Sequence, residues 1–211
     1  MTIPCVYCLR NNQLREEQIL MRGENLYVCA PRGQLIEGYL AIAPYHCIGS
    51  FSRAPESHLD ELARMSAVVT SFYERVYGAH QATFYEQGRA GRGALLDKAA
   101  GFPLHAHLCC LPQPVDLHSA LAREFEPKSL QGPRDLPAVV GNEPYAYIDL
   151  LDRRIVYLAR SEEQRVELES KRLKHTIAEL IGLPERADWR DYPGDHELEQ
   201  LIECWRNAWP R

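Results

Sequence analysis

The side chains with the clearest chemical potential lie in one short segment, residues 105–112. Its sequence, His-Ala-His-Leu-Cys-Cys-Leu-Pro, predicts a strand over residues 105–111. Because side chains alternate between the two faces of a strand, His105, His107 and Cys109 are expected to share one face. A row of imidazoles on a sheet can bind a metal, hold phosphate oxygens or attack phosphorus. The simplest alternative is two histidines without any chemical role.

Seven cysteines are a second source of possible chemistry, at positions 5, 8, 29, 47, 109, 110 and 204. Since the sequence carries no secretion signal, we interpret them as thiols or metal ligands rather than as a disulfide framework. Cys5 and Cys8 form a C-x-x-C pair, which by itself indicates an incidental or redox pair as readily as two metal ligands. Cys29, Cys47 and Cys110 are interpreted as small buried apolar residues.

The elements that must position these residues begin with short strand-like segments, at residues 18–21, 25–30, 38–43 and 82–86. Residues 55–77 carry apolar side chains at every third or fourth position, which predicts one long amphipathic helix. A glycine-rich loop, residues 88–93, precedes the strand that carries the histidines. This order predicts an α+β fold, with a largely antiparallel sheet and a long packing helix, for residues 1–112.

The chain after Pro112 is predicted to be an α/β extension, residues 113–211, that packs on the core. It contains a short helix, a proline-rich stretch, two strands and two longer helices, of which the regular segments are expected at 117–125, 145–151, 154–159, 162–181 and 196–209. The sequence shows no internal repeat and no low-complexity segment. An independent second domain is therefore the less favoured alternative.

Composition restricts the partners of the protein. The 211 residues include 24 Lys+Arg and 29 Asp+Glu, for a formal net charge of -5. This balance gives no general attraction for long nucleic acid or for an anionic membrane, although local positive groups could still bind a small anion. The apolar runs are short and the N-terminus lacks a targeting pattern, so we expect a cytoplasmic protein.

Several segments, taken in order, resemble the histidine-triad (HIT) superfamily of nucleotide hydrolases and transferases. The 105–111 segment is similar to the alternating three-histidine signature of that family, with Cys109 in the third position. Further similar segments are the strand that ends in a histidine, the Phe-x-Glu-x-Gly element of one bacterial branch, and the end of the C-terminal extension of that branch, at 38–46, 84–88, 180–184 and 189–190. The resemblance implies a HIT-like fold and a homodimer.

The resemblance also implies a structural zinc site. In zinc-containing members, two N-terminal cysteines, the histidine after the second long strand and the first histidine of the signature bind the metal. The corresponding residues here are Cys5, Cys8, His46 and His105. These residues form a Cys2His2 set, which tetrahedral Zn2+ accepts.

The activity that the resemblance implies is hydrolysis or transfer of a nucleotide at its α-phosphate. His107 would be the nucleophile and would form a nucleotidyl-histidine intermediate, with Cys109 beside it as a modifier of rate. The substrate would be a small nucleotide or a nucleotidylated metabolite, bound by Glu86, Gly88, Arg89 and Arg92.

Two alternatives from other classes remain open at this point. One is a zinc-stabilised nucleotide-binding protein without turnover. The other is a thiol redox protein that uses Cys5 with Cys8, or Cys109 with Cys110. The second is less favoured because neighbouring residues of a strand point to opposite faces.

Overall fold

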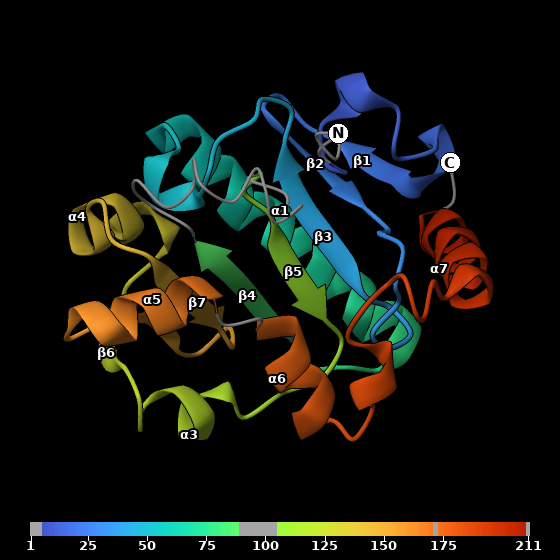
Figure 1. The fold of residues 1–211 in the computed structure, drawn as a ribbon. Helices are drawn as coiled ribbons and strands as arrows, with labels where there is room; N and C mark the ends of the chain where they lie inside the picture. The colour runs from blue at the N-terminus through green and yellow to red at the C-terminus, as the bar shows by residue number, and fades with distance from the viewer. Residues whose placement is uncertain (1–5, 89–104, 171–172, 210–211) are drawn as a thin grey trace.

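The computed structural model of the chain describes residues 6–88, 105–170 and 173–209. Within these residues, eight strands form one antiparallel sheet in the order β1-β2-β3-β5-β4-β7-β8-β6, which runs diagonally through Figure 1. The strands are β1 (Ile19–Arg22), β2 (Leu26–Cys29), β3 (Leu40–Pro44), β4 (Thr83–Gly88), β5 (Leu108–Leu111), β6 (Glu126–Leu130), β7 (Tyr145–Asp149) and β8 (Arg154–Leu158).

Helices cover both faces of this sheet. They are α1 (Glu56–Tyr77), α3 (Leu117–Leu121), α4 (Leu136–Val140), α5 (Glu162–Ser170), α6 (Leu173–Leu180) and α7 (Asp195–Ala208). The long α1 lies behind the sheet in Figure 1, and α4 and α7 contribute to the same apolar layer. On the opposite face, α3, α5 and α6 pack against the middle of the sheet, while residues 7–14 cover β2 and β3. The predicted α+β class is therefore confirmed.

Among the differences between the predicted and the observed elements after residue 104, three concern strands or the longest predicted helix of the extension. The expected strand 105–111 begins at Leu108, so His105 and His107 precede the strand. The expected helix 162–181 is described as α5 and α6, with residues 171 and 172 outside the described part of the chain. Strand β6 was not predicted because it contains Pro127, but this strand ends the sheet order and pairs only with β8. Proline is tolerated at such an edge, where its missing N–H is not needed.

The strands of the predicted extension continue the sheet of the predicted core. Five register pairs join β7 to β4, and β8 and β6 follow outwards. The predicted boundary at residue 112 therefore falls within a single sheet. Across the described ranges, no helix is both long and apolar enough to cross a membrane.

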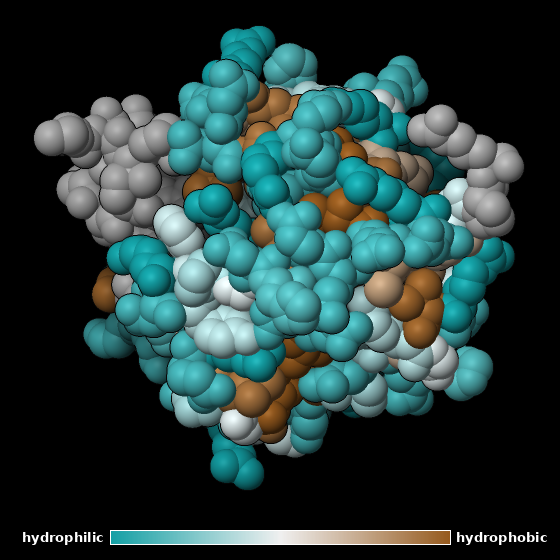
Figure 2. All heavy atoms as spheres, turned by 90° about the vertical axis from the view of Figure 1, so that its right-hand side faces the viewer, coloured by the Kyte–Doolittle hydropathy of each residue, from teal (hydrophilic) through white to brown (hydrophobic). Residues whose placement is uncertain are grey.

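The side of the molecule formed by β1 and α7 is shown in Figure 2. Hydrophilic side chains cover most of it and enclose smaller apolar areas. A hollow of about 230 Å³ opens here, lined by Glu16, Glu17, Ile19, Leu20, Trp205 and Arg206. None of these lining residues belongs to the site predicted from the sequence.

Candidate functional site

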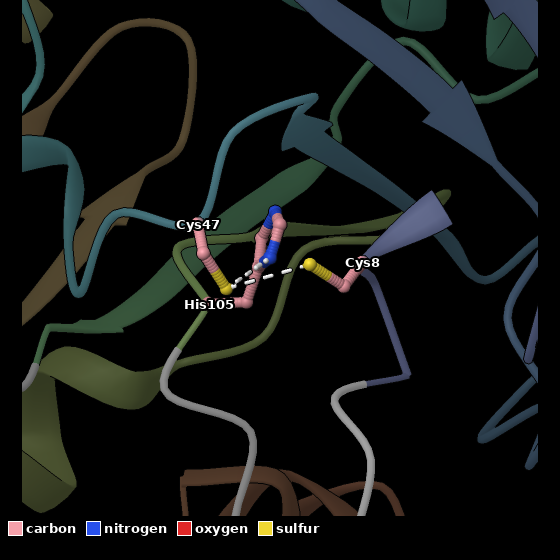
Figure 3. Close-up of side chains that lie close together, drawn as sticks. All are labelled: Cys8, Cys47 and His105. Atoms are coloured by element: carbon pink, nitrogen blue, oxygen red, sulfur yellow. Dashed lines mark hydrogen bonds between the residues drawn. The ribbon is translucent and has the colours of Figure 1, made fainter. Parts of the chain in front are cut away.

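Three side chains of types that can bind a metal converge beside the start of β5. Figure 3 shows Cys8, Cys47 and His105 pointing toward one another from three separate segments of the chain. The Sγ atoms of Cys8 and Cys47 are 3.7 Å apart, and Cys47 Sγ is 3.1 Å from His105 Nδ1. All three candidate ligand atoms lie within 4.8 Å of one another.

Strand pairing explains why these residues meet. Strands β3 and β5 are antiparallel, with Ile42 opposite Leu108, so the end of β3 lies beside the residues that precede β5. The backbone N–H of Ala106 donates to the Ile48 carbonyl at 2.7 Å and extends this contact. The loop that contains Cys47 is thereby held next to His105.

The hydrogen bonding of His105 leaves one ring nitrogen available to a metal. The ring is only 2% exposed, and its Nε2 lies 2.7 Å from the Pro44 carbonyl oxygen. Because a carbonyl can only accept, Nε2 carries the proton and Nδ1 faces Cys47 with a lone pair. Backbone carbonyls commonly fix the tautomer of metal-binding histidines in this way. Burial lowers the pKa of His105 to about 4, against the opposing effect of the Pro44 carbonyl, so the ring is neutral near pH 7.

The distances fit the geometry of zinc. A tetrahedral ion with Zn–S bonds of about 2.3 Å separates two sulfur ligands by about 3.8 Å, and the observed Sγ–Sγ separation is 3.7 Å. A sulfur and a nitrogen ligand of the same ion would be about 3.6 Å apart, and here they are 3.1 Å apart. Opening this contact by about half an ångström would bring it to the zinc value, and the remaining Cys8–His105 separation lies within 4.8 Å. The donor set of two thiols and one imidazole also suits zinc.

The group overlaps only partly with the four ligands predicted from the sequence. Cys8 and His105 are present, whereas His46 is exposed and is not part of the group. Cys5 lies outside the described residues. Cys47 was missed because it was interpreted as a small buried residue, and the structure shows it exposed. Cys47 directly follows His46 in the sequence. The residue at which β3 ends therefore determines which of these two side chains reaches the group.

A second polar cluster surrounds Cys109, on the same face of the sheet. Tyr39 donates a hydrogen bond of 2.9 Å to Cys109 Sγ, and the hydroxyls of Tyr39 and Tyr85 are 3.2 Å apart. His107 faces Cys109 and interacts with it electrostatically. Lys174 lies over the Tyr39 ring and donates to the Gly33 carbonyl at 2.8 Å. We call Cys109, His107, Tyr39 and Tyr85 the thiol cluster.

The thiol cluster favours the ionised form of Cys109. Burial alone would raise the pKa of the thiol, but the facing His107 and the nearby hydroxyls of Tyr39 and Tyr85 lower it below the ordinary value. Burial likewise acts to lower the pKa of His107, but the facing Cys109 outweighs it and raises the pKa. The two groups therefore form a mutually stabilising pair.

Tyr7 connects the two sites. Its ring stacks on His107, with ring centroids 4.4 Å apart and planes inclined by 22°. The Tyr7 carbonyl accepts a hydrogen bond of 2.5 Å from the buried Tyr27 hydroxyl. Tyr7 directly precedes Cys8, so one short segment both covers the thiol cluster and contributes to the metal group.

The predicted substrate-binding residues occupy less open positions. Glu86 is buried and accepts hydrogen bonds from the Phe51 N–H at 2.9 Å and the Tyr145 hydroxyl at 2.5 Å. Gly88 is also buried, and a Cβ there would lie 2.0 Å from the Tyr145 ring. Arg89 and Arg92 lie outside the described residues. The described part of this predicted subsite is therefore engaged in packing β4 against its neighbours.

Comparison with known proteins gives a family for residues 2–124, described as "Protein similar to CwfJ C-terminal". Similarity to two curated proteins covers nearly the whole chain. Zinc finger CCCH domain-containing protein 64 of Arabidopsis thaliana is 24% identical over 94% of this chain and 33% of its own length. CWF19-like protein 1 of Xenopus laevis is 23% identical over 98% of this chain and 38% of its own length. The chain thus spans about a third of the length of the curated relatives that it matches.

Among solved structures, a hypothetical histidine triad nucleotide-binding protein from Sulfolobus tokodaii aligns with 96% of this chain and 94% of its own. The TM-score is 0.41 and the sequence identity is 14%. A match at this level supports no conclusion about activity.

These findings correct the family that the sequence motifs suggested. The predicted membership of the histidine-triad superfamily is wrong, because the matching family is that of proteins similar to the CwfJ C-terminal region and one curated relative is a CWF19-like protein. The predicted hydrolase or nucleotidyltransferase reaction through a nucleotidyl-histidine falls with it, as does the alternative of a nucleotide-binding protein. The surroundings of His107 also differ from those that the motif suggested, because the Tyr7 ring stacks on its imidazole and the Cys109 thiol faces it. The family match spans more than half of the chain and includes every residue of the metal group and the thiol cluster, so the chain belongs to the family of proteins similar to the CwfJ C-terminal region.

Proposed function

We propose that this chain is a zinc-binding domain whose ion joins the N-terminal segment to the central sheet. The proposal rests on one observation, the convergence of Cys8, Cys47 and His105 with their ligand atoms within 4.8 Å of one another. Cys8 comes from the N-terminal segment, Cys47 from the loop after β3 and His105 from the residues before β5. An ion bound to all three connects parts of the chain that are up to 97 positions apart in sequence, from Cys8 to His105.

A structural role suits the surroundings of the group. The N-terminal segment meets the sheet through a small apolar cluster, in which Tyr7 and Leu14 pack against Tyr27, Cys29 and Ala41. Bound zinc supplies strong, closed coordination, and the binding free energy then adds to the free energy of folding. Cys5 stays the predicted fourth ligand. As a C-x-x-C pair in sequence, Cys5 and Cys8 would contribute two thiolates.

The comparisons support a domain within longer proteins. The chain corresponds to about a third of each curated relative, and we infer that the zinc site stabilises the region that it shares with them. Two expectations stay predictions: that the chain is an enzyme, and that it binds a small molecule. The proposed zinc site requires neither.

Metal analysis of the purified full chain tests this proposal. We expect about one zinc ion per chain, as for a structural site with one ligand set, and a lower melting temperature after treatment with a chelator. Cys8→Ser should lose the ion. Cys204→Ser is the matched control, since Cys204 is a partly buried thiol on α7 that lies outside the group.

The proposal is overturned if the metal-free chain melts at the same temperature as the purified protein. It is also overturned if Cys8→Ser and Cys204→Ser retain equal amounts of zinc.

A further inference from the structure

We propose that Cys8 and Cys47 form a reversible disulfide when the chain meets a small-molecule disulfide, and that this bond and the zinc ion exclude each other. The pair is then an oxidation site as well as part of a metal site. The formation of the bond is argued from the distance between the two sulfurs and from their exposure. Only the expulsion of the ion rests on the proposed zinc site.

The two sulfurs are held close together by separate segments of the chain. Cys8 Sγ donates a weak hydrogen bond to Cys47 Sγ, and the two atoms are 3.7 Å apart. A disulfide has an S–S bond of about 2.05 Å, so the sulfurs must approach by about 1.7 Å. Both residues lie outside the strands and helices, since Cys8 precedes the 3-10 helix Leu9–Asn11 and Cys47 lies in the loop after β3. No strand therefore has to break for the sulfurs to meet.

Exposure determines the order in which the two thiols react. Among the described cysteines, Cys47 is the only exposed one, and Cys8 is partly buried. Access to the sulfur is one of the factors that set the rate of thiol–disulfide exchange. A dissolved disulfide therefore reacts with Cys47 first, and Cys8 is the neighbouring thiol that resolves the product.

The reaction with oxidised glutathione consists of two exchanges. In the first, the Cys47 sulfur attacks one glutathione sulfur, so that a mixed disulfide forms while the glutathione S–S bond breaks. The released glutathione takes the proton that Cys47 gives up. In the second, the Cys8 sulfur attacks the Cys47 sulfur of the mixed disulfide and releases the other glutathione, which takes the Cys8 proton. The protein thus loses two hydrogens, and oxidised glutathione is reduced to two thiols.

The disulfide and the ion require the same two sulfur atoms. Zinc binds cysteine as the thiolate, and a disulfide sulfur no longer carries that charge. The bond removes two of the three members of the metal group and leaves His105, so the ion departs. A bound ion, in turn, keeps the sulfurs about 3.8 Å apart and slows the exchange. After oxidation, a covalent bond joins the N-terminal segment to the loop after β3 in place of the metal.

The test uses the full chain, exposed to oxidised glutathione before and after removal of zinc with a chelator. Peptide mass spectrometry without reduction identifies the linked cysteines, and a chromogenic chelator measures released zinc in the same samples. We expect a Cys8–Cys47 peptide in both samples, formed more slowly while zinc is bound. About one zinc ion should be released per disulfide, as for a site with one ligand set.

The equilibrium of the metal-free chain with reduced and oxidised glutathione gives the effective concentration of one thiol at the other. Two sulfurs that the fold holds side by side should exceed about 1 mM, the value for partners on a short flexible tether.

Serine variants of the metal-free chain test the order of the two steps. Cys8→Ser should accumulate the mixed disulfide on Cys47, because the resolving thiol is missing. Cys47→Ser should lose the linked peptide. Cys5→Ser removes the other cysteine of the C-x-x-C pair and should still form the Cys8–Cys47 bond. Cys204→Ser is the control and should behave as the wild type, since Cys204 lies outside the group.

The inference is overturned if oxidised glutathione links Cys5 to Cys8 instead, or if the effective concentration is below about 1 mM. Modification of the buried Cys110 as fast as Cys47 would also overturn it, because the folded pair would then have no advantage. A disulfide that forms while zinc stays bound would contradict the exclusion. A chain that is purified without zinc and still forms the Cys8–Cys47 bond would contradict the proposed function alone.

Discussion

Two neighbouring cysteines of β5 lie in opposite environments. Cys109 faces α6 and the N-terminal segment, where the Tyr39 hydroxyl donates to its sulfur and its pKa is lowered despite burial. Cys110 faces α1 in the apolar layer, where burial, together with the nearby Cys109, raises its pKa well above the ordinary value. The residue type is the same and the positions differ by one. Because side chains alternate between the faces of a strand, Cys109 points toward polar groups and can take part in chemistry. Cys110 points into the apolar layer and contributes to packing.

The same contrast holds for the two faces of the sheet as a whole. The α1 face is filled by large apolar side chains from α1, α7 and the strands β2 to β8. The other face carries the metal group and the thiol cluster beneath the N-terminal segment and α6. If this contrast is correct, substitutions on the α1 face should mainly change stability, and those on the other face should mainly change reactivity and metal binding.

The largest stability effect is expected on the α1 face, at Phe72. This side chain is fully buried and contacts the Trp205 ring, with centroids 4.6 Å apart. Phe72→Ala should lower the free energy of unfolding by about 3–5 kcal/mol, because it removes a large side chain from a closed core. Denaturant titration measures this loss, and Val166→Ala, at a position 59% exposed, is the control. A loss below about 1 kcal/mol, the range of surface substitutions, would show that this face is not closely packed.

A pH-dependent effect is expected from Glu86, the buried carboxyl on the α1 face. Burial raises its pKa to about 7, although hydrogen bonds from Tyr145 and the Phe51 N–H and the charge of His107 oppose the shift. The folded state therefore binds a proton that the unfolded state has already released. The stability contributed by the neutral form is fully present below the unfolded pKa, near 4.5, and is lost as the pH rises through about 7.

Glu86→Gln tests this directly because glutamine does not titrate. Between about pH 4 and pH 8, wild-type stability should fall by about 3 kcal/mol relative to the variant. Chemical unfolding at several pH values gives the difference. A constant difference across the range would contradict the assigned pKa.

The smallest stability effects are expected at Cys109 and Cys110. Measuring both tests the difference between the two faces of the sheet most directly. Cys110→Ser places a hydroxyl in the apolar layer and should cost about 1–3 kcal/mol. Cys109→Ser places an oxygen among existing donors and should cost less than about 1 kcal/mol. The two melting curves can be measured side by side. Equal losses would show that the donors around Cys109 do not distinguish the two faces.

The sequence predicted the regular elements better than the site. The apolar spacing of residues 55–77 gave α1 within one residue, because a long amphipathic helix carries many independent signals. The proline in β6 hid an edge strand, since local sequence does not reveal whether a strand lies at the edge of a sheet. The alternation of His107, Cys109 and Cys110 correctly placed the two thiols on opposite faces.

The metal group could be predicted only in part from the sequence. Cys8 and His105 were selected from a family resemblance that the comparisons overturned, yet the structure brings both together. Cys47 was not selected, because its participation depends on how the loop after β3 turns. Spacing along the chain carries little information on such a turn, whereas the pairing of β3 with β5 determines it.

The most direct test of the proposed zinc centre is the metal content of two neighbouring variants, Cys47→Ser and His46→Ala, purified in parallel. The structure places Cys47 in the group and leaves His46 exposed outside it. We expect Cys47→Ser to lose its zinc and His46→Ala to retain about one ion per chain, as a structural site with intact ligands does. Loss of zinc from His46→Ala, with retention in Cys47→Ser, would contradict the ligand set and the account built on it.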